Sequence, residues 1–352
     1  MSHYRVLGIM SGTSLDGLDL AYCQFHWVNH TWSFSIDQAE TLAYPDKWRQ
    51  KLQIKKDRSQ EALVELHNHY GSYIGEQARW FLDKHNLKVD FIASHGHTLF
   101  HEPGKKISFQ LGNGPFIAAS SGITTLWDFR SLDIALGGQG APLVPIGDEL
   151  LFADYKYCLN LGGFSNISFN DNNRRIAFDI CPVNIILNAL AREAGYPYDK
   201  DGWLASRGQS HQKLLDELNN LSFYQQKGPK SLGIEWVNRY MVPVLNKYDI
   251  SAADKLNTLT DHISFQIQKI INQYGKGKIL LTGGGAYNTF LIDKLRDYLG
   301  DELIIPEPLL IDYKEALIFA FLGTLRKRNQ INCLSSVTGA RQDSSCGNIC
   351  RV

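Results

Sequence analysis

The spacing of apolar residues predicts three strands at the start of the chain. Residues 4–10 are mostly apolar, and residues 18–27 return to residue types common in strands after a polar turn. In residues 31–37 an apolar side chain occupies every second position, which is the pattern of a strand with one buried face. The chain therefore opens with strand, turn, strand and strand.

A long amphipathic helix is predicted after these strands, over residues 59–85. Its apolar residues recur at steps of three and four, which places them on one stripe of the helix. They are Leu63, Leu66, Tyr70, Ile74, Ala78 and Phe81. The rest of the first half predicts short strands at residues 89–93, 107–111 and 123–128, with a small helix before the last of them.

The second half of the chain repeats this order. Three strands are predicted first, with a glycine turn after the first strand and an Asp-Asn-Asn turn before the third. Their ranges are residues 157–161, 165–170 and 174–180. Helices are predicted at residues 184–194, 209–219, 234–247 and 253–273, followed by a strand at 278–282, a helix to residue 299 and a last helix at 313–328.

A duplication with a period of roughly 155 residues predicts an α/β protein of two related lobes with a cleft between them. We expect residues 1–150 to form the N-terminal lobe and residues 151–352 the C-terminal lobe, with the last helix able to return to the N-terminal lobe. The length of 352 residues agrees with this division, because it is too long for one ordinary core.

Composition excludes several classes of protein. Apolar residues make up 44% of the chain and charged residues 20%, which excludes disorder, collagen and a coiled coil. Lys plus Arg and Asp plus Glu both number 36, so the chain lacks the basic excess of a dedicated nucleic-acid binder. The apolar stretch at residues 316–325 is too short to cross a bilayer, and no signal peptide precedes the first strand. We therefore expect a cytoplasmic protein without nucleic-acid or membrane partners.

The six cysteines are scattered over the chain, which is typical of reduced thiols rather than of a disulfide framework. Cys346 and Cys350 stand four positions apart in a polar tail. A metal or redox role for this pair is the less favoured interpretation, because no second cysteine pair or histidine cluster accompanies it.

The turn between the first two strands carries the densest polar chemistry. Residues 10–19, MSGTSLDGLD, contain two glycines, three hydroxyls and two carboxylates. Glycines let a backbone approach a phosphate, hydroxyl and N–H groups donate to its oxygens, and an aspartate can position hydrated Mg²⁺. An ordinary polar hairpin loop is the alternative, since the P-loop pattern is absent. The phosphate-binding candidates are Gly12, Thr13, Ser14, Leu15, Asp16, Gly17, Leu18 and Asp19.

Two further glycine turns follow predicted strands. Gly162 and Gly163 end the first strand of the second half. Gly283, Gly284 and Gly285 lie between a strand and a helix, and a helix N-terminus favours anionic groups. Three such turns at equivalent strand ends facing one cleft would suit a nucleoside triphosphate, whereas a single one would mean little.

A polar stretch joins the two halves. Arg130 can present a bidentate donor fork to a carboxylate or phosphate, and a surface salt bridge to Asp128 or Asp133 is the equal alternative. Glycines and prolines around Gln139 predict a fixed, irregular loop. Upstream, residues 94–98, SHGHT, follow a predicted strand directly, so we expect their side chains to point into the cleft, although isolated histidines are more often structural.

Asp179 ends the third strand of the second half. A carboxylate at the mouth of a cleft is a candidate general base. A helix cap is the alternative, because Pro182 and a predicted helix follow. The sequence leaves both roles open.

Together these segments resemble the anhydro-N-acetylmuramic acid kinase family, a branch of the sugar-kinase, heat-shock-protein and actin superfamily. The resemblance covers nearly the whole chain, and its segments fall in the family's order. They are MSGTSLDGLD, SHGHT, DFRSLDIALGGQGAPLVP, LNLGGFSNIS, DGWLASRG, PKSLG, LTGGGAYN, KEALIFA and SVTGA. MSGTSLDG and GGQGAPLVP are highly specific together.

The resemblance implies a two-lobed, actin-like ATPase fold of duplicated βββαβαβα units with an inter-lobe cleft that closes over ATP, and a homodimer. It also implies a phosphotransferase with an alcohol group as acceptor, using ATP and Mg²⁺. Such a kinase opens 1,6-anhydro-N-acetylmuramic acid with water and phosphorylates it to N-acetylmuramic acid 6-phosphate during peptidoglycan recycling.

The resemblance also implies roles for residues of this chain. Asp179 would be the base that activates water. The loop from Gly12 to Asp19, with Gly162 and Gly163, would hold the phosphates, and Mg²⁺ would arrive with ATP near Asp16 or Asp19 without a direct protein site. Gly283, Gly284 and Gly285 would form the adenosine-side loop. The substrate-binding positions would be His95, Gly96, Arg130, Asn184 and Glu315.

One segment departs from the family pattern. The family usually reads Asp-Thr-Gly-Pro-Gly-Asn where this chain reads Asp179-Ile180-Cys181-Pro182-Val183-Asn184. If the family's glycines need a positive φ, a side chain there costs about 1 kcal/mol or more. If they let the sugar approach, the added methyl groups narrow the pocket.

Smaller departures are His97 and Asn113, where the family tends to have Gln and Asp. The departures leave two alternatives to an active anhydro-sugar kinase. One is a catalytically impaired homologue that binds nucleotide or muropeptide, and the other is a kinase of a different amino sugar.

Overall fold

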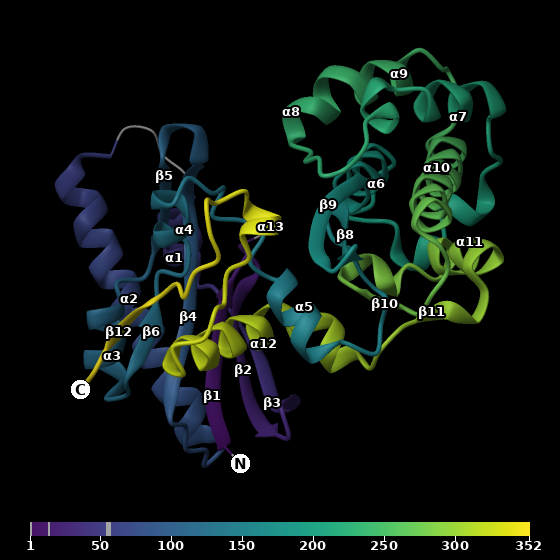
Figure 1. Cartoon of the computed structure of the whole chain (residues 1–352). Helices are drawn as coiled ribbons and strands as arrows, with labels where there is room; N and C mark the ends of the chain where they lie inside the picture. Colours follow the sequence, from purple (N-terminus) through teal and green to yellow (C-terminus); the bar gives the residue numbers. More distant parts are fainter. Residues whose placement is uncertain (1, 13–14, 54–57) are drawn as a thin grey trace. The chain divides into compact units, whose positions relative to one another are not determined.

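The computed structural model describes residues 2–12, 15–53 and 58–352. The chain divides into two compact units. The first unit is Met1–Leu151 with Tyr313–Val352, and the second unit is Phe152–Asp312. In Figure 1 the second unit, from β7 to β11, is coloured from teal to yellow-green, and both chain ends belong to the first unit.

The first unit is built on a seven-stranded sheet whose strand order is β12-β6-β4-β1-β2-β3, with β5 paired to β4. The strand β2 runs antiparallel to both β1 and β3, whereas β4 lies parallel to both β1 and β6. The bounds are β1 (Ser2–Ser11), β2 (Gly17–Val28), β3 (Thr31–Ala43), β4 (Phe91–Glu102), β5 (Ile107–Leu111), β6 (Thr125–Trp127) and β12 (Asn348–Cys350).

The long helix of the first unit is α2 (Gln60–Lys84), and it forms where the apolar stripe predicts it. Ser59 caps it, because the Ser59 hydroxyl accepts a hydrogen bond from the Ala62 N–H at 3.2 Å. All stripe residues except Leu63 are buried against the sheet. The other helices are α1 (Asp46–Leu52), α3 (Gly114–Ser121), α4 (Ser131–Ala135), α5 (Pro145–Leu151), α13 (Ser335–Thr338) and the 3-10 turn η1 (Pro103–Lys105). The helix α12 (Pro308–Lys327) belongs to the first unit from Tyr313 onward.

The second unit is built on a five-stranded sheet whose strand order is β11-β10-β7-β8-β9. The turn between β8 and β9 has φ angles of 49° at Asn172 and 60° at Asn173, as the Asp-Asn-Asn sequence predicts. The bounds are β7 (Tyr157–Leu161), β8 (Phe164–Asp171), β9 (Arg174–Pro182), β10 (Ile279–Thr282) and β11 (Leu303–Ile304).

Helices and short turns surround this sheet. The range predicted as one helix, residues 234–247, contains α8 (Ile234–Trp236), a π turn η5 (Val237–Met241) and α9 (Val242–Asn246). The remaining helices are α6 (Asn184–Glu193), α7 (Gln212–Asn219), α10 (Ala252–Tyr274) and α11 (Thr289–Leu299), with 3-10 turns η2 (Lys200–Gly202), η3 (Ala205–Arg207), η4 (Ser222–Gln225), η6 (Gly284–Tyr287) and η7 (Gly300–Glu302).

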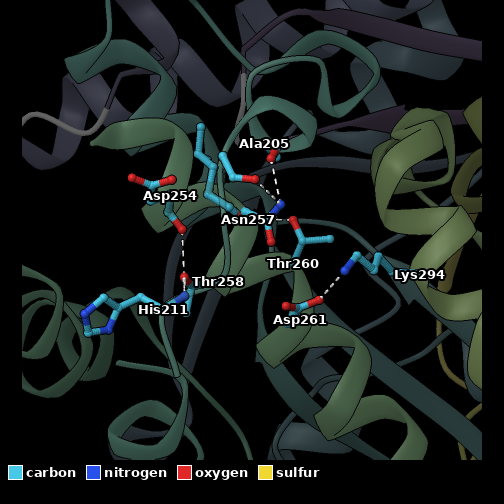
Figure 2. Close-up of polar contacts among 10 residues, drawn as sticks. Ala205, His211, Asp254, Asn257, Thr258, Thr260, Asp261 and Lys294 are labelled. Carbon is cyan, nitrogen blue, oxygen red and sulfur yellow. Dashed lines mark hydrogen bonds and ion pairs between the residues drawn. The ribbon is translucent and has the colours of Figure 1, made fainter. Parts of the chain in front are cut away.

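Polar side chains of α10 tie neighbouring segments to this helix (Figure 2). The Asn257 amide donates to the carbonyl oxygens of Ala205 and Gly208 at 3.0 and 2.9 Å. Asp261 forms an ion pair of 2.8 Å with Lys294 of α11. The segment before α7 and the helix α11 are therefore both held against α10.

The two sheets confirm the predicted α/β fold and its duplication. If β5 and β12 of the first sheet are left out, the strands of both sheets lie in the same order, with the third strand along the chain followed by the second, first, fourth and fifth: β3-β2-β1-β4-β6 and β9-β8-β7-β10-β11. This is the βββαβαβα arrangement of the actin-like fold that the sequence predicts. Among the described helices, none is long and apolar enough to span a membrane.

Candidate functional site

The polar turn predicted to bind phosphate joins β1 to β2. Thr13 and Ser14 lie outside the described residues. Leu15 has a φ of 61°, and its N–H donates to the Gly12 carbonyl oxygen at 3.3 Å. Asp16 is exposed. The turn thus presents a carboxylate to solvent next to a tight backbone bend.

The other end of this predicted loop lies in strand β2. Gly17 pairs with Ala43 of β3, and the Leu18 side chain is fully buried in the core. Asp19 accepts a hydrogen bond from the Thr41 hydroxyl at 2.6 Å. Leu18 can therefore offer only its backbone to a ligand.

A buried series of hydrogen-bonded hydroxyl and imidazole groups begins at Ser11, directly before this turn. The Ser11 hydroxyl lies 3.0 Å from His97 Nδ1 and accepts a hydrogen bond from the Tyr44 hydroxyl at 2.7 Å. The Tyr44 hydroxyl is also 2.6 Å from that of Tyr70. Burial lowers the pKa of His97 and raises the pKa of Tyr44 to about 12, so both groups stay neutral near pH 7. The sequence gives no spacing signal for these contacts, because Tyr44 lies between β3 and α1 and the other members come from β1, α2 and β4.

The sequence predicts that the segment SHGHT follows a strand, but the segment lies inside β4. The strand continues because residues 97–102 pair with β5. Gly96, with a φ of 74°, lies where the pairing of β4 with β1 is irregular. His95 and His97 are only 5% and 3% exposed. Both histidines are therefore largely shielded from solvent, although Ser94 and His95 line a cavity.

His95 is instead a partner of Arg130. Nε and Nη2 of Arg130 lie 3.0 and 2.9 Å from His95 Nε2, and Nη1 donates to the Gly140 carbonyl oxygen at 2.5 Å. Because a guanidinium group only donates, His95 Nε2 must accept, and Nδ1–H donates to the Gly96 carbonyl oxygen at 2.9 Å. Burial and the charge of Arg130 both lower the pKa of His95 well below its usual range. The imidazole is therefore neutral with one defined tautomer.

Arg130 makes neither of the salt bridges that the sequence left open, since no ion pair with Asp128 or Asp133 occurs among the described residues. Burial lowers its pKa to about 10, and the negative charge of Glu315 acts against this shift. The guanidinium thus remains cationic at neutral pH.

Asp133 anchors the loop that lies against Arg130. This fully buried carboxylate accepts hydrogen bonds from the Gly140 N–H and the Thr338 hydroxyl, both at 2.7 Å, and from the Cys333 thiol at 3.1 Å. The Gln139 N–H donates to the Thr338 carbonyl oxygen at 2.8 Å. The glycine-rich loop around Gln139 is fixed, as its composition predicts. The sequence does not indicate that Asp133 anchors this loop, because two of its partners lie about 200 positions away in the chain.

Glu315 lies on α12, which packs directly on β1. A side chain at Gly8 would place its Cβ 2.1 Å from the Ala316 carbonyl oxygen, so this close approach requires glycine. The Glu315 side chain is accessible to solvent, yet the density of protein around it raises its pKa, with Arg130 opposing the shift and Asp19 adding to it. Asp19, Arg130 and Glu315 therefore belong to one group of interacting charges in the first unit.

A cavity of about 150 Å³ lies beside His95 of β4, at the carboxyl end of β6. Ligands in α/β sheets bind at this edge. Aromatic and polar side chains line it, including His67, Ser94, Phe109, Gln110, Trp127 and Asp128.

The two glycine turns of the second unit meet at the start of α6. The Gly162 carbonyl oxygen accepts from the Asn184 N–H at 3.2 Å, and the Asn184 amide donates to the Leu161 carbonyl oxygen at 3.1 Å. Gly283 has a φ of 84°, and a Cβ there would lie 2.5 Å from Asn160 Oδ1. Gly284 lies beside Asn184, since a Cβ there would be 3.7 Å from its amide nitrogen. These glycines and Asn184 thus form one cluster at the ends of β7 and β10.

The expectation that the glycines of the third turn stand at a helix N-terminus is wrong. The 3-10 turn Gly284–Tyr287 intervenes, and α11 begins after Asn288. The Asn288 side chain caps this helix by accepting from the Leu291 N–H at 3.0 Å. The helix dipole is therefore separated from the glycines by about one turn.

Asp179 is half-buried in β9 and is not a helix cap, because α6 begins after Val183 and has no side-chain cap. Asp179 Oδ2 accepts a hydrogen bond from the Leu232 N–H at 2.8 Å. Burial raises the pKa of Asp179, and this hydrogen bond acts against the rise. Its carboxylate has no ion pair among the described residues, so the group could take up a proton.

The residues that depart from the family pattern point into the core of the second unit. Ile180, Cys181 and Val183 are at most 1% exposed and belong to its hydrophobic core. The φ of Val183 is −126°, so the concern about a positive φ does not apply. Their side chains fill the core, and the expectation that added methyl groups narrow a pocket is not supported by their position.

The described part of the chain holds no group of three or more His, Cys, Asp or Glu residues placed to bind a metal. Cys350 is partly exposed in β12, and the other five cysteines are buried and unpaired by disulfides. Asp16 and Asp19 offer carboxylate oxygens of the kind that Mg²⁺ prefers when it arrives with a nucleotide.

Comparison with known proteins identifies the relatives of this chain. The family model described as anhydro-N-acetylmuramic acid kinase matches residues 4–351. An anhydro-N-acetylmuramic acid kinase of Mannheimia succiniciproducens is 35% identical and covers 99% of this chain and 98% of its own length. One of Pseudomonas putida is also 35% identical and covers 90% of this chain and 91% of its own.

Solved structures resemble the chain more remotely. Component A of the Acidaminococcus fermentans (R)-2-hydroxyglutaryl-CoA dehydratase has 12% identity and a TM-score of 0.45, covering 90% of this chain and 96% of that one. A ROK family glucokinase from Streptomyces griseus, in complex with glucose and AMPPNP, has 11% identity and a TM-score of 0.41, covering 90% and 98%. The sequence matches are decisive: the chain belongs to the anhydro-N-acetylmuramic acid kinase family, a family of phosphotransferases with an alcohol group as acceptor.

Proposed function

We propose that this protein uses ATP to convert 1,6-anhydro-N-acetylmuramic acid into N-acetylmuramic acid 6-phosphate during peptidoglycan recycling. Membership of the family supports the kinase activity. The observation that carries the specific reaction is Asp179, a half-buried carboxylate without an ion pair among the described residues. An anhydro sugar needs such a group, because water must be activated to open its bridge.

In the proposed reaction, water attacks the anomeric carbon and Asp179 takes its proton. The bond between the anomeric carbon and the bridging oxygen breaks, and that oxygen forms a bond to the γ-phosphorus of ATP while ADP leaves. A raised pKa makes Asp179 a stronger base than an ordinary aspartate. Since only the ionised carboxylate accepts the proton, the rate falls as the pH drops through this pKa, at a higher pH than for an exposed aspartate.

The first unit supplies the proposed sugar-binding residues His95, Gly96, Arg130 and Glu315. Arg130 has five N–H groups, of which His95 and Gly140 engage three, so two remain for a substrate oxygen. The carboxylate of Glu315 is accessible and can accept from a sugar hydroxyl. The loop from Gly12 to Asp19 is the proposed phosphate site, and Mg²⁺ bound with ATP would neutralise charge on the transferred group near Asp16 or Asp19.

The second unit supplies the remaining proposed nucleotide and sugar residues. The glycine cluster at the ends of β7 and β10 is the proposed ATP site, with Gly162 and Gly163 on the phosphate side and Gly283, Gly284 and Gly285 on the adenosine side. Asn184 is the proposed sugar contact. A homodimer and a cytoplasmic location stay predictions from the sequence.

The proposal is tested by incubating the protein with MgATP and the anhydro sugar and analysing the product by mass spectrometry. We expect ADP and a sugar 6-phosphate whose mass includes one added water. Open-chain N-acetylmuramic acid and other amino sugars serve as comparison substrates, because only an anhydro sugar requires activation of water. Lack of turnover at near-stoichiometric enzyme contradicts the proposal, and faster turnover of an open-chain sugar favours the kinase of a different amino sugar.

The impaired homologue remains the other alternative. It was motivated by Ile180, Cys181 and Val183, and these side chains lie in the core of the second unit. The departure therefore gives no structural reason to prefer an inactive protein. Tight binding of ATP or the sugar, measured by calorimetry, in the absence of turnover would favour the impaired homologue.

A further inference from the structure

The strand that carries Asp179 has a bulge directly after this residue. In the pairing of β8 with β9, Asn166 lies opposite Asp179 and Ser165 lies opposite Cys181, so Ile180 has no partner. The Ser165 hydroxyl closes the gap by accepting from the Cys181 N–H at 3.2 Å and lying 3.1 Å from the Cys181 carbonyl oxygen. Bulges of this kind redirect a side chain and are typical of functional strands.

A second segment covers the outer edge of β9 at the same point. The Asp179 N–H donates to the Lys230 carbonyl oxygen at 2.9 Å, and the Leu232 N–H donates to Asp179 Oδ2 at 2.8 Å. Gly228 packs on Phe178, because a Cβ at Gly228 would lie 2.8 Å from the ring. Residues 228–232, which include the PKSLG motif without its last glycine, therefore hold both the backbone and one carboxylate oxygen of Asp179.

The Lys230 side chain anchors this segment to the turn η4. Its ammonium group donates to the Phe223 and Gln226 carbonyl oxygens at 2.8 and 3.1 Å and lies 4.2 Å from the centre of the Phe223 ring. Lys269 of α10 donates to the Tyr224 carbonyl oxygen of the same turn at 3.0 Å. Two lysines thus hold one turn, but only Lys230 belongs to the segment that contacts Asp179.

We propose that Lys230 is a positioning residue for the general base, which it serves by fixing the backbone of residues 230–232 so that the Leu232 N–H holds Asp179 Oδ2. The other carboxylate oxygen, Oδ1, has no hydrogen-bond partner among the described residues and is the one left to accept a proton from water. This inference rests on the proposed role of Asp179 and adds the element that orients it.

Among the described residues, no charged group shifts the pKa of Asp179. A change in this pKa on loss of the Leu232 hydrogen bond should therefore be measurable. Within the part of the chain that the structure describes, the Leu232 N–H is the group that lowers the pKa of Asp179 against the effect of burial. The titratable groups on the packed elements include Lys230 itself, Lys269 and His262 of α10, Tyr224 of η4 and the Cys181 thiol of β9. Burial raises the pKa of Cys181 to about 12, raises that of Tyr224 well above its ordinary value and lowers that of His262 to about 3. Burial lowers the pKa of Lys230 to about 8, with Lys269 adding to the shift. Loss of the Lys230 anchor should therefore act on Asp179 mainly through the Leu232 hydrogen bond.

The test compares Lys230→Met, Lys230→Arg and Lys269→Met in the full-length protein. Methionine keeps a long apolar stem but cannot donate, so we expect kcat with the anhydro sugar to fall about 10-fold to 100-fold and the acidic limb of the pH profile to rise by about half to one pH unit. Arginine retains a donor and should restore most of kcat and the original limb. Lys269→Met loosens the same turn and should leave the limb unchanged.

A second readout separates this inference from the proposed reaction. Carboxyl carbon NMR of ¹³C-aspartate-labelled protein gives the pKa of Asp179 directly, with Asp179→Asn to assign the signal. We expect a higher pKa in Lys230→Met than in the unsubstituted protein and no change in Lys269→Met. If the unsubstituted protein has no turnover, the proposed reaction fails while this titration still tests the anchor. Equal titration curves in all three folded proteins would overturn the role of Lys230, whatever the activity.

Discussion

The third strands of the two units occupy the same place in their sheets but carry different chemistry. The strand β3 pairs with β2 along its whole length of 13 residues, with one irregularity between Tyr22 and Cys23. The strand β9 is shorter, has a bulge after Asp179 and is covered on its outer edge by residues 230–232. Equal topology thus leaves the chemistry of an edge strand undetermined, because local irregularity and the covering segment decide it.

The polar groups of the two units differ in the same way. In the first unit charges have partners: Lys314 pairs with Asp148 at 2.8 Å in the interior, and Arg130 interacts with Glu315. In the second unit the carboxylate of Asp179 has only a neutral N–H donor among the described groups. The second unit also contains ion pairs, such as Asp261 with Lys294, so the difference is specific to Asp179: a carboxylate with a raised pKa and no paired cation is suited to move a proton.

The largest expected effect is that of Asp179→Asn, which removes the proton acceptor of the second unit. Asparagine has nearly the same shape and can still accept from the Leu232 N–H through its oxygen. We expect kcat with the anhydro sugar to fall about 1,000-fold, because an amide cannot take a proton from water. Steady-state kinetics at saturating MgATP measures this.

The same variant should keep its stability. Removing a half-buried charge that lacks an ion pair relieves a desolvation cost, so the free energy of unfolding should stay equal or rise slightly. A variant that stays folded and fully active would show that Asp179 is not the base.

The next effect is that of Arg130→Lys in the first unit. Lysine keeps the charge but loses the fork that contacts His95 and Gly140 together. We expect kcat/KM for the sugar to fall about 10-fold to 100-fold with little change in the KM for ATP. Arg49→Lys, at an exposed position of α1, is the matched control and should behave as the unsubstituted protein.

The sequence predicts the strands and the long helices well where the apolar period is clear, as in β7 and α2. It fails where pairing partners are remote. Residues 94–98 look like the end of a strand because they are polar and contain Gly96, but pairing with β5 extends β4 through them. The eleven-residue helix α11 begins later than expected because a 3-10 turn precedes it.

The candidate site shows the same limit. Asp179 stands out in the sequence because a carboxylate follows an apolar run. Its partner Leu232 is 53 residues away, and no pattern joins the two. The sequence suggests Asp128 and Asp133 as partners of Arg130, yet Arg130 contacts His95, which lies 35 residues earlier. Contacts that depend on tertiary folding therefore lie beyond what spacing can predict.

A smaller effect, on stability alone, is expected for Asp133→Asn. The carboxylate of Asp133 accepts from Gly140, Thr338 and Cys333, and it is fully buried. An amide has only one acceptor oxygen and places two N–H donors among these donors, so we expect a loss of about 2 to 3 kcal/mol in the free energy of unfolding. Urea unfolding measures it. The contrast with Asp179→Asn sharpens the comparison, since one aspartate stabilises its unit and the other does not, and equal losses in both variants would contradict it.

The smallest expected effects come from the serine caps of the long helices, one in each unit. Ser59 of α2 accepts one hydrogen bond, from the Ala62 N–H at 3.2 Å. Ser251 of α10 accepts from the Asp254 N–H at 3.1 Å and also donates to the Asp254 carboxylate at 2.7 Å. Ser59→Ala and Ser251→Ala should each cost about 1 kcal/mol, with the larger loss at Ser251 because a charge-assisted bond disappears as well. Hydrogen exchange of the first-turn amides measures each helix separately, and an equal or larger effect at Ser59 would show that the bond to Asp254 contributes nothing to the cap.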